Sequence, residues 1–156
     1  MEKRGLLLDM VLVSDPQLLC VVRAAIERLT EVAGFSPPEC RSITRALDEA
    51  LANVMRHAYG NRTDQRIEIS CSHISHKHQG REREALEIRV IDWGVAMDPE
   101  KLTSRSLDEV KPGGLGLHFI RDSMDIVERS RVEGANQLRL AKYLSQKDSV
   151  KDHQGE

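Results

Sequence analysis

Three polar side chains recur at four-residue spacing in one segment of the chain: Glu49, Asn53 and His57. Residues four apart lie on the same face of a helix. In a half-buried cleft, a carboxylate can act as a general base and an amide oxygen can ligate a hard cation. The spacing therefore gives a candidate catalytic edge, and its alternative is the ordinary solvated edge of an amphipathic helix.

An acidic residue and a glycine close an apolar run in the segment Val90-Ile-Asp92-Trp-Gly94. A carboxylate at the end of a buried strand can accept a hydrogen bond from an amino group on a planar base, and a glycine lets the backbone approach a ligand closely. The alternative is an aspartate that caps a turn. Asp92 and Gly94 are therefore candidate ligand-binding residues.

Glycines also gather just before a helix-like segment, at Gly113, Gly114 and Gly116. Glycines at a helix start leave backbone N–H groups free to face an anion, and the helix dipole favours phosphate there. The segment is neither a P-loop, which needs Gly-Lys-Ser/Thr, nor a dinucleotide fingerprint, which needs a preceding strand and a third spaced glycine.

A fourth cluster contains Cys71, His73, His76 and His78. Thiolate and imidazole groups are good zinc ligands, which makes a metal site one interpretation. No second cysteine pair or fixed ligand spacing supports a structural zinc site. Because this polar segment lies between two alternating apolar runs, we predict that residues 73–84 form a solvated loop.

The elements that must position these residues begin with a strand over residues 6–13 and a helix capped by Ser14 or Asp15 and ended at Gly34. A second helix begins at a capping box, Ser36 to Glu39, and runs to about residue 59. Period-two runs predict strands over residues 67–71 and 86–90. The sequence pattern predicts a helix over residues 115–124. It also predicts a hairpin of two strands, residues 126–132 and 137–143, with its turn at residues 133–136.

This order of elements does not alternate as a doubly wound sheet does. It predicts an α+β fold, a two-layer α/β sandwich in which helices pack on one face of a mixed β-sheet.

Composition narrows the class of protein. The 156 residues suit one domain, and 23 Lys and Arg against 25 Asp and Glu lack the basic excess of a nucleic-acid binder. Aromatic residues make up 3%, too few for base-stacking platforms. No run approaches the ~20 apolar residues of a membrane span, and three cysteines without a close pair indicate a reducing compartment. We expect a soluble cytoplasmic protein that binds neither nucleic acid nor membrane.

Together and in this order, three segments resemble the nucleotide-binding boxes of the GHKL ATPases, the superfamily shared by histidine kinases and gyrase. Residues 46–59 resemble the N box, residues 92–94 the adenine-binding box and residues 113–117 the phosphate-binding glycine box. The resemblance covers about residues 5–144 and implies a Bergerat-type ATP-binding fold. The small size and the run GGLGLHFIRDSMD resemble the anti-sigma-factor serine kinases of bacterial partner-switching systems.

The resemblance implies roles for the candidate residues. Asn53 would ligate the Mg²⁺ that bridges the ATP phosphates, and Glu49 would be the general base. Asp92 would accept a hydrogen bond from the adenine amino group, and Gly94 would line that pocket. His57 matches a position that is often histidine in this family.

The glycine box, Gly113, Gly114 and Gly116, would supply backbone contacts to phosphate. Between the boxes, a lid could reach the γ-phosphate with basic side chains, although such loop residues are usually only solvated; the candidates are Lys101, Arg105 and Lys111. The adenine box departs from the family pattern, because Val95 and Ala96 stand where a second glycine or a proline is usual.

The function implied is an ATP- and Mg²⁺-dependent serine/threonine protein kinase and anti-sigma regulator. It would phosphorylate a small STAS-type antagonist protein and sequester a sigma factor or analogous target, and a homodimer is left open. Residues 1–144 would form the kinase domain and residues 145–156 a polar tail.

Two alternatives remain from the sequence. One is a non-catalytic module that uses nucleotide only to control partner binding. The other is a detached histidine-kinase catalytic domain, disfavoured because the sequence shows no upstream helical hairpin with a phosphoacceptor histidine.

Overall fold

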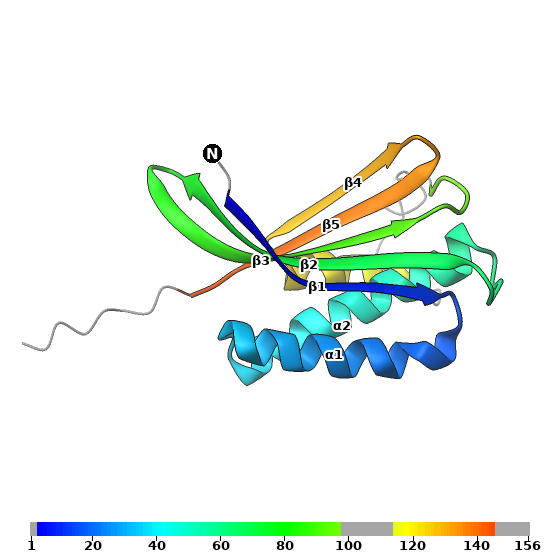
Figure 1. Cartoon of the computed structure of the whole chain (residues 1–156), viewed down its shortest axis with the longest axis horizontal. Helices are drawn as coiled ribbons and strands as arrows, with labels where there is room; N and C mark the ends of the chain where they lie inside the picture. Colours follow the sequence, from blue (N-terminus) through cyan, green and yellow to red (C-terminus); the bar gives the residue numbers. More distant parts are fainter. Residues whose placement is uncertain (1–2, 98–113, 146–156) are drawn as a thin grey trace, which may run out of the picture.

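The computed structural model describes residues 3–97 and 114–145, and these residues form two layers (Figure 1). One layer is a five-stranded sheet made of β1 (Lys3–Val13), β2 (Arg66–His78), β3 (Arg81–Asp92), β4 (Ile126–Val132) and β5 (Ala135–Tyr143). The other layer contains η1 (Pro16–Leu18), α1 (Leu19–Ala33), α2 (Pro37–Asn53), η2 (Val54–Ala58) and α4 (Gly114–Ser123). The helices cover one face of the sheet, so the expected two-layer α+β architecture is confirmed.

The strand order is β1-β2-β3-β5-β4, and every pairing among the described strands is antiparallel. The expectation of a mixed sheet was wrong in this respect. The physical reason is the connection between β1 and β2: two successive helices, α1 and α2, bring the chain back to the end of the sheet that β1 has just left. A single crossover helix would have made the two strands parallel.

The expected signals at the helix ends are confirmed. Ser36 is the N-cap of α2: its Oγ accepts from the Glu39 N–H at 3.4 Å, and the Ser36 N–H donates to Glu39 Oε2 at 2.8 Å. Gly34 ends α1 in the left-handed region, with φ of 99°. Local backbone chemistry therefore fixes where these two helices meet.

The second helix does not continue as an α-helix to residue 59. After Asn53 it widens into the π-helical turn η2, in which the Tyr59 N–H donates to the Val54 carbonyl at 3.0 Å. A π turn rotates the residues that follow it relative to those before it. The four-residue stripe of the sequence is therefore interrupted between Asn53 and His57.

The histidine-rich segment is part of a long hairpin, so the prediction of a solvated loop over residues 73–84 was wrong. β2 and β3 pair from Ile67 to His78, and only Gln79 and Gly80 form the turn, both with positive φ. The outer part of the hairpin carries polar side chains on both faces, which hides the period of two. There His73 Nε2 lies 2.6 Å from Glu84 Oε2.

Cys71, in contrast, faces the core, and burial, assisted by the charge of Asp9, raises the pKa of its thiol to about 12. Within residues 3–97 and 114–145, no three His, Cys, Asp or Glu side chains are grouped as a metal site.

Apolar side chains of α2 pack directly against the centre of the sheet. The helix contributes Ile43, Leu47, Ala50 and Leu51, and the strands contribute Ile67, Ile69, Ile88 and Val90. This core holds the end of β3 and the C-terminal half of α2 in fixed relation. Of the helices described, none is both long and apolar enough to cross a membrane.

Candidate functional site

Asn53 closes the α-helical part of α2 and is almost fully buried, with 1% of its surface exposed. Neither its Oδ1 nor its Nδ2 has a hydrogen-bond partner among the described residues. Leaving a buried amide unpaired costs on the order of 1–3 kcal/mol, so such a group is suited to bind a ligand. An amide oxygen is a ligand that Mg²⁺ and Ca²⁺ accept, so Asn53 fits the cation role that the sequence predicted.

Glu49 lies one turn before Asn53 on the same α-helix and is half-buried. His57 is exposed on η2, beyond the π turn, and lines a shallow hollow together with Trp93 and Arg62. The structure thus keeps Glu49 and Asn53 on one helical face and places His57 in different surroundings.

Asp92 lies at the end of β3, where the strand is paired with β2 on one side and β5 on the other. Its side chain is buried, with 2% exposed. Oδ1 accepts from the Gly94 N–H at 2.9 Å and from Asn136 Nδ2 at 2.8 Å. Both bonds go to one oxygen, so they fix the plane of the carboxylate and orient Oδ2.

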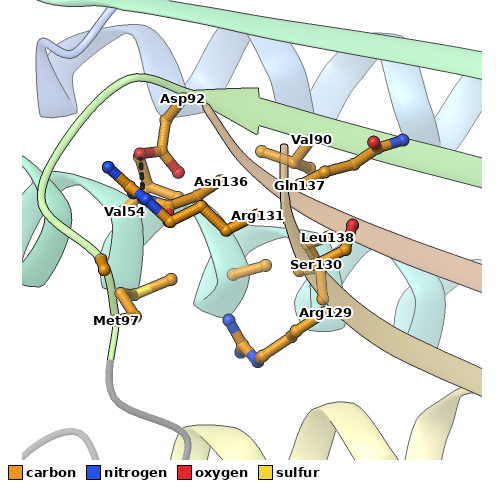
Figure 2. Close-up of a pocket in the computed structure, with 12 residues that line it drawn as sticks. Val54, Val90, Asp92, Met97, Arg129, Ser130, Arg131, Asn136, Gln137 and Leu138 are labelled. Atoms are coloured by element: carbon orange, nitrogen blue, oxygen red, sulfur yellow. Dashed lines mark hydrogen bonds between the residues drawn. The ribbon is translucent and has the colours of Figure 1, made fainter. Parts of the chain in front are cut away.

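A cavity of about 250 Å³ opens beside Asp92, between the sheet and α2 (Figure 2). Its walls are largely apolar and come from both layers: Ala50, Val54, Val90, Met97 and Leu138. A small apolar cleft with a few fixed polar groups is the usual form of a site for a small organic ligand. Asp92 is the buried carboxylate of this cleft.

Gly94 lies close to η2, and its predicted role beside the ligand stays a prediction. Among the described residues it lines the hollow of His57, and a Cβ at position 94 would lie 2.3 Å from the Ala58 carbonyl oxygen. The next residue, Val95, donates its N–H to the same oxygen at 2.9 Å. The glycine therefore lets the end of β3 pack against η2.

Tyr59 reinforces this junction. Its hydroxyl accepts from the Trp93 N–H at 2.8 Å and donates to the Arg66 carbonyl. Burial raises the pKa of Tyr59, and the nearby charge of Asp92 adds to this, so the phenol keeps its proton. The π turn and the end of β3 are thus joined by hydrogen bonds on both sides of Gly94.

The polar residues that line the cavity without having been identified from the sequence are Arg129, Ser130, Arg131, Asn136 and Gln137. Asn136 lies opposite Asp92 on β5, and Arg131 Nη1 donates to Asn136 Oδ1 at 2.7 Å. The position of these residues at the cavity depends on which strands become neighbours of β3, and this pairing joins residues that are far apart in the sequence.

The glycine box lies at the start of α4. Gly114 and Gly116 belong to the first turn of this helix, whereas Gly113 lies outside the described residues. The three candidate lid residues, Lys101, Arg105 and Lys111, and the polar tail from residue 146 also lie outside them. The packing of α4 against α2 places the glycine-bearing helix in the same layer as Asn53.

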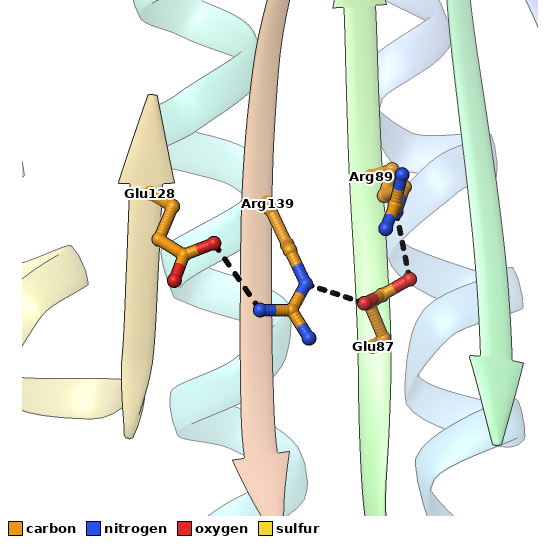
Figure 3. Close-up of polar contacts among 4 residues, drawn as sticks. All are labelled: Glu87, Arg89, Glu128 and Arg139. Carbon is orange, nitrogen blue, oxygen red and sulfur yellow. Dashed lines mark hydrogen bonds and ion pairs between the residues drawn. The ribbon is translucent and has the colours of Figure 1, made fainter. Parts of the chain in front are cut away.

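On the opposite face of the sheet, a charged network links three strands (Figure 3). Glu87, with 1% exposed, receives hydrogen bonds from Arg89 at 2.7 Å and Arg139 at 2.5 Å, and Arg139 also reaches Glu128 at 3.2 Å. Burial is the largest single influence and raises the pKa of Glu87, but the two arginines together outweigh it and lower the pKa. This network stabilises the sheet away from the cavity.

Comparison with known families and proteins agrees with this geometry. A family model described as a histidine kinase-like ATPase domain matches residues 12–142. Serine-protein kinase RsbW of Bacillus pumilus is 24% identical over 147 residues, covering 89% of this chain and 86% of that protein. Serine/threonine-protein kinase BtrW of Bordetella bronchiseptica is 32% identical over 106 residues, covering 65% and 69%.

Two solved structures share the fold. The RsbU and RsbW domains of Rv1364c from Mycobacterium tuberculosis match with a TM-score of 0.59 and 16% identity, over 90% of this chain and 33% of that longer chain. The SiaB-SiaC complex from Pseudomonas aeruginosa matches with a TM-score of 0.55 and 11% identity, over 89% and 91%. At these identities the two structures support the architecture alone.

Proposed function

This chain belongs to the histidine kinase-like ATPase domain family, and from that premise we propose that it binds ATP and transfers its terminal phosphoryl group to a serine or threonine of a small protein partner. The observation that carries the proposal is the cavity beside Asp92. It combines a buried, oriented carboxylate with apolar walls, and one of those walls is the helix that bears Glu49 and Asn53.

We propose that adenine occupies this cavity. Its amino group would donate to Asp92 Oδ2, while Val54, Met97 and Leu138 would contact the faces and edges of the ring. Asn136 would act as a positioning residue, because it holds Asp92 Oδ1. A base that presented an acceptor in place of the amino group would face a carboxylate without a donor, so the site would favour adenine.

Asn53 would hold Mg²⁺ through Oδ1, which fits its buried and unpartnered amide. Bound Mg²⁺ would neutralise the charge that develops on the ATP phosphates. Gly114 and Gly116, at the start of α4, would donate backbone N–H groups to phosphate, and Gly113 would extend this box.

Glu49 would accept the proton of the attacking serine or threonine hydroxyl. It shares a helical face with Asn53 one turn away, so the base and the cation ligand would approach the same phosphate group. His57, on the far side of the π turn, is assigned no part in this step.

The partner follows from the resemblance and from the named relatives. We propose a STAS-type antagonist protein as the phosphoacceptor and a sigma factor or analogous target as the sequestered partner, which would place the chain in the cytoplasm. Relatives named serine-protein kinase RsbW and serine/threonine-protein kinase BtrW support the kinase activity. Residues 1–144 would form the kinase domain.

The test is to incubate the full chain with Mg²⁺, γ-labelled ATP and the candidate antagonist encoded beside it, and then to locate the label by mass spectrometry. We expect one phosphorylated serine or threonine on the antagonist and none in a reaction without Mg²⁺. Label on a histidine of either protein would contradict the proposal.

A further inference from the structure

The wall of the cavity opposite Asp92 carries an arginine that the proposed function does not yet use. Arg129 belongs to β4 and lies opposite Leu138 of β5, a core residue, so its side chain projects toward the helices. Figure 2 shows Asp92 and the guanidinium of Arg129 at opposite sides of the cavity, whose lining also includes Val54 and Met97. An arginine thus occupies an inward-facing position of the sheet.

Nη2 of Arg129 is buried and has no hydrogen-bond partner within the described part of the chain. A buried guanidinium nitrogen that lacks a partner costs stability, because it loses water without gaining an equivalent contact. Burial lowers the pKa of Arg129, the nearby charge of Arg121 lowers it further, and only Asp92 acts in the opposite direction. The local environment therefore favours the arrival of an anion.

The neighbouring arginine differs in this respect. Arg131 Nη1 donates to Asn136 Oδ1 at 2.7 Å and to the Gly94 carbonyl at 3.3 Å, so it supports the carboxylate end of the cavity. Arg129 is the cavity arginine with an open donor. The cavity consequently combines a carboxylate on one side, apolar wall residues and an unsatisfied cationic donor on the other side.

We propose that Arg129 binds the phosphate chain of the nucleotide whose base lies against Asp92. This inference rests on the proposed function, since it takes adenine as the occupant of the carboxylate end. A ligand with an amino group on a flat apolar ring and an anionic tail matches these three features of the cavity. The guanidinium would supply a charge-assisted hydrogen bond to a phosphate oxygen.

The experiment compares adenosine with ADP, because the two share the base and ribose and differ in the phosphates. Dissociation constants are measured by calorimetry, with displacement for the weaker ligand, on the parent chain and on Arg129→Gln. We expect Arg129→Gln to weaken ADP binding by about 10- to 100-fold and adenosine binding by less than about twofold. Arg129→Lys, which keeps the charge, should lose less affinity for ADP than Arg129→Gln does.

Arg28→Gln is the matched control, since it removes an equal charge from an exposed ion pair on α1 and should leave both constants unchanged. Equal weakening of adenosine and ADP by Arg129→Gln would overturn the proposal in favour of a base contact or a structural role. Unchanged ADP binding would overturn it as well. A parent chain that binds neither ligand would overturn the proposed function itself, an outcome distinct from both.

A second measurement does not depend on affinity. Arg129→Met replaces the unsatisfied charge by a shorter, flexible apolar group, so the ligand-free variant should melt at or above the Tm of the parent. The rise in Tm produced by saturating ADP should shrink in the same variant. A ligand-free Tm clearly below that of the parent would show that Arg129 stabilises the fold, and the phosphate role would be rejected.

Discussion

Asp92 is held in one orientation by a short chain of hydrogen bonds that also fixes the Asn136 amide. Arg131 donates to Asn136 Oδ1, so the amide must turn its Nδ2 toward its two acceptors, Asp92 Oδ1 and the Val95 carbonyl at 2.9 Å. Because Oδ1 receives both N–H groups, Oδ2 is oriented by them and keeps its own acceptor positions. The side chain is thereby prepared to accept one more donor.

We predict that Asp92→Asn weakens ATP binding by about 1–3 kcal/mol. The amide Nδ2 would face the adenine amino group, donor against donor, at a buried position. Calorimetric titration with Mg²⁺·ATP measures the change. Asp64→Asn, at an exposed carboxylate outside the cavity, should bind as the parent does. Equal affinity of Asp92→Asn and the parent would remove Asp92 from the site.

Residue types predicted part of the candidate site and missed the rest. Asp92 and Asn53 could be identified because a polar group at a strand end or in a four-residue helical stripe is visible in one local segment. Asn136 could not, because its role depends on β5 being the neighbour of β3, a pairing between residues more than 40 positions apart. The assigned roles of Glu49 and Asn53 stay predictions.

At the scale of elements, the contact between the end of β3 and the π turn η2 determines the shape of the site. The Ala58 carbonyl accepts from the Val95 N–H and lies where a Cβ of residue 94 would be. A backbone carbonyl cannot move aside as a flexible side chain can. The glycine is thus required by packing between two elements, whichever ligand occupies the cavity.

We therefore predict that Gly94→Ala lowers the free energy of unfolding by about 1–3 kcal/mol, the usual cost of overpacking. Urea denaturation monitored by circular dichroism measures it. Gly5→Ala is the control, because a Cβ there meets nothing within 4 Å and should leave stability unchanged or slightly higher. If Gly94→Ala unfolded at the same urea concentration as the parent, the close contact with η2 would be wrong.

The charged network of Figure 3 makes the stability of the fold depend on pH. The pKa of Glu87 is lowered in the folded state, so its ionised form stabilises the fold above the unfolded pKa, and this contribution is lost as pH falls through the folded pKa. We predict that Glu87→Gln is less stable than the parent at pH 7 by about 1–3 kcal/mol. The difference should shrink steadily as the pH is lowered below about 4.5.

Urea unfolding at a series of pH values tests this prediction. Glu128→Gln removes the exposed carboxylate of the same network and should change stability by less than about 1 kcal/mol at any pH. A Glu87→Gln deficit that stayed constant down to pH 3 would show that packing, and not the charge, supplies the stabilisation.

The ends of helices were predictable where the chemistry of a few neighbouring residues determines them. The capping box at Ser36 and the left-handed Gly34 are short-range features, and both lie where the sequence placed them. The hairpin of β2 and β3 was shortened in the prediction because its outer part is polar on both faces. The π turn left no periodic signal, since its single wide turn depends on the partners of its carbonyl groups.

At the scale of the whole molecule, the order of the elements predicted two layers but not the strand order β1-β2-β3-β5-β4. Helical and alternating segments each need an apolar partner, which leads to a helix layer on a sheet. Which strands become neighbours is decided by long-range packing. That packing brings the β4–β5 hairpin beside β3 and so completes the cavity with Asn136 and Arg129.

Two functions of the whole molecule remain to be distinguished. One is a kinase, and the other is a module that only exchanges protein partners when its nucleotide changes. In the kinase, Asn53 and Glu49 act at different stages. We predict that Asn53→Ala weakens Mg²⁺-dependent ATP binding, because a cation ligand is lost before any reaction. Glu49→Gln should bind ATP almost as the parent does, yet transfer phosphate about 10²- to 10⁴-fold more slowly, because a proton acceptor acts in the transition state.

Both variants are compared with the parent by calorimetry and by single-turnover phosphorylation of the antagonist, with Asp64→Asn as the control. If Glu49→Gln phosphorylates the partner at the parental rate, Glu49 is not the base, although the chain remains a kinase. If the parent transfers no phosphate but changes its affinity for the antagonist between ATP and ADP, the module is correct. The cavity would then act only as a switch, since ligand binding in it stabilises one arrangement of the two layers over another.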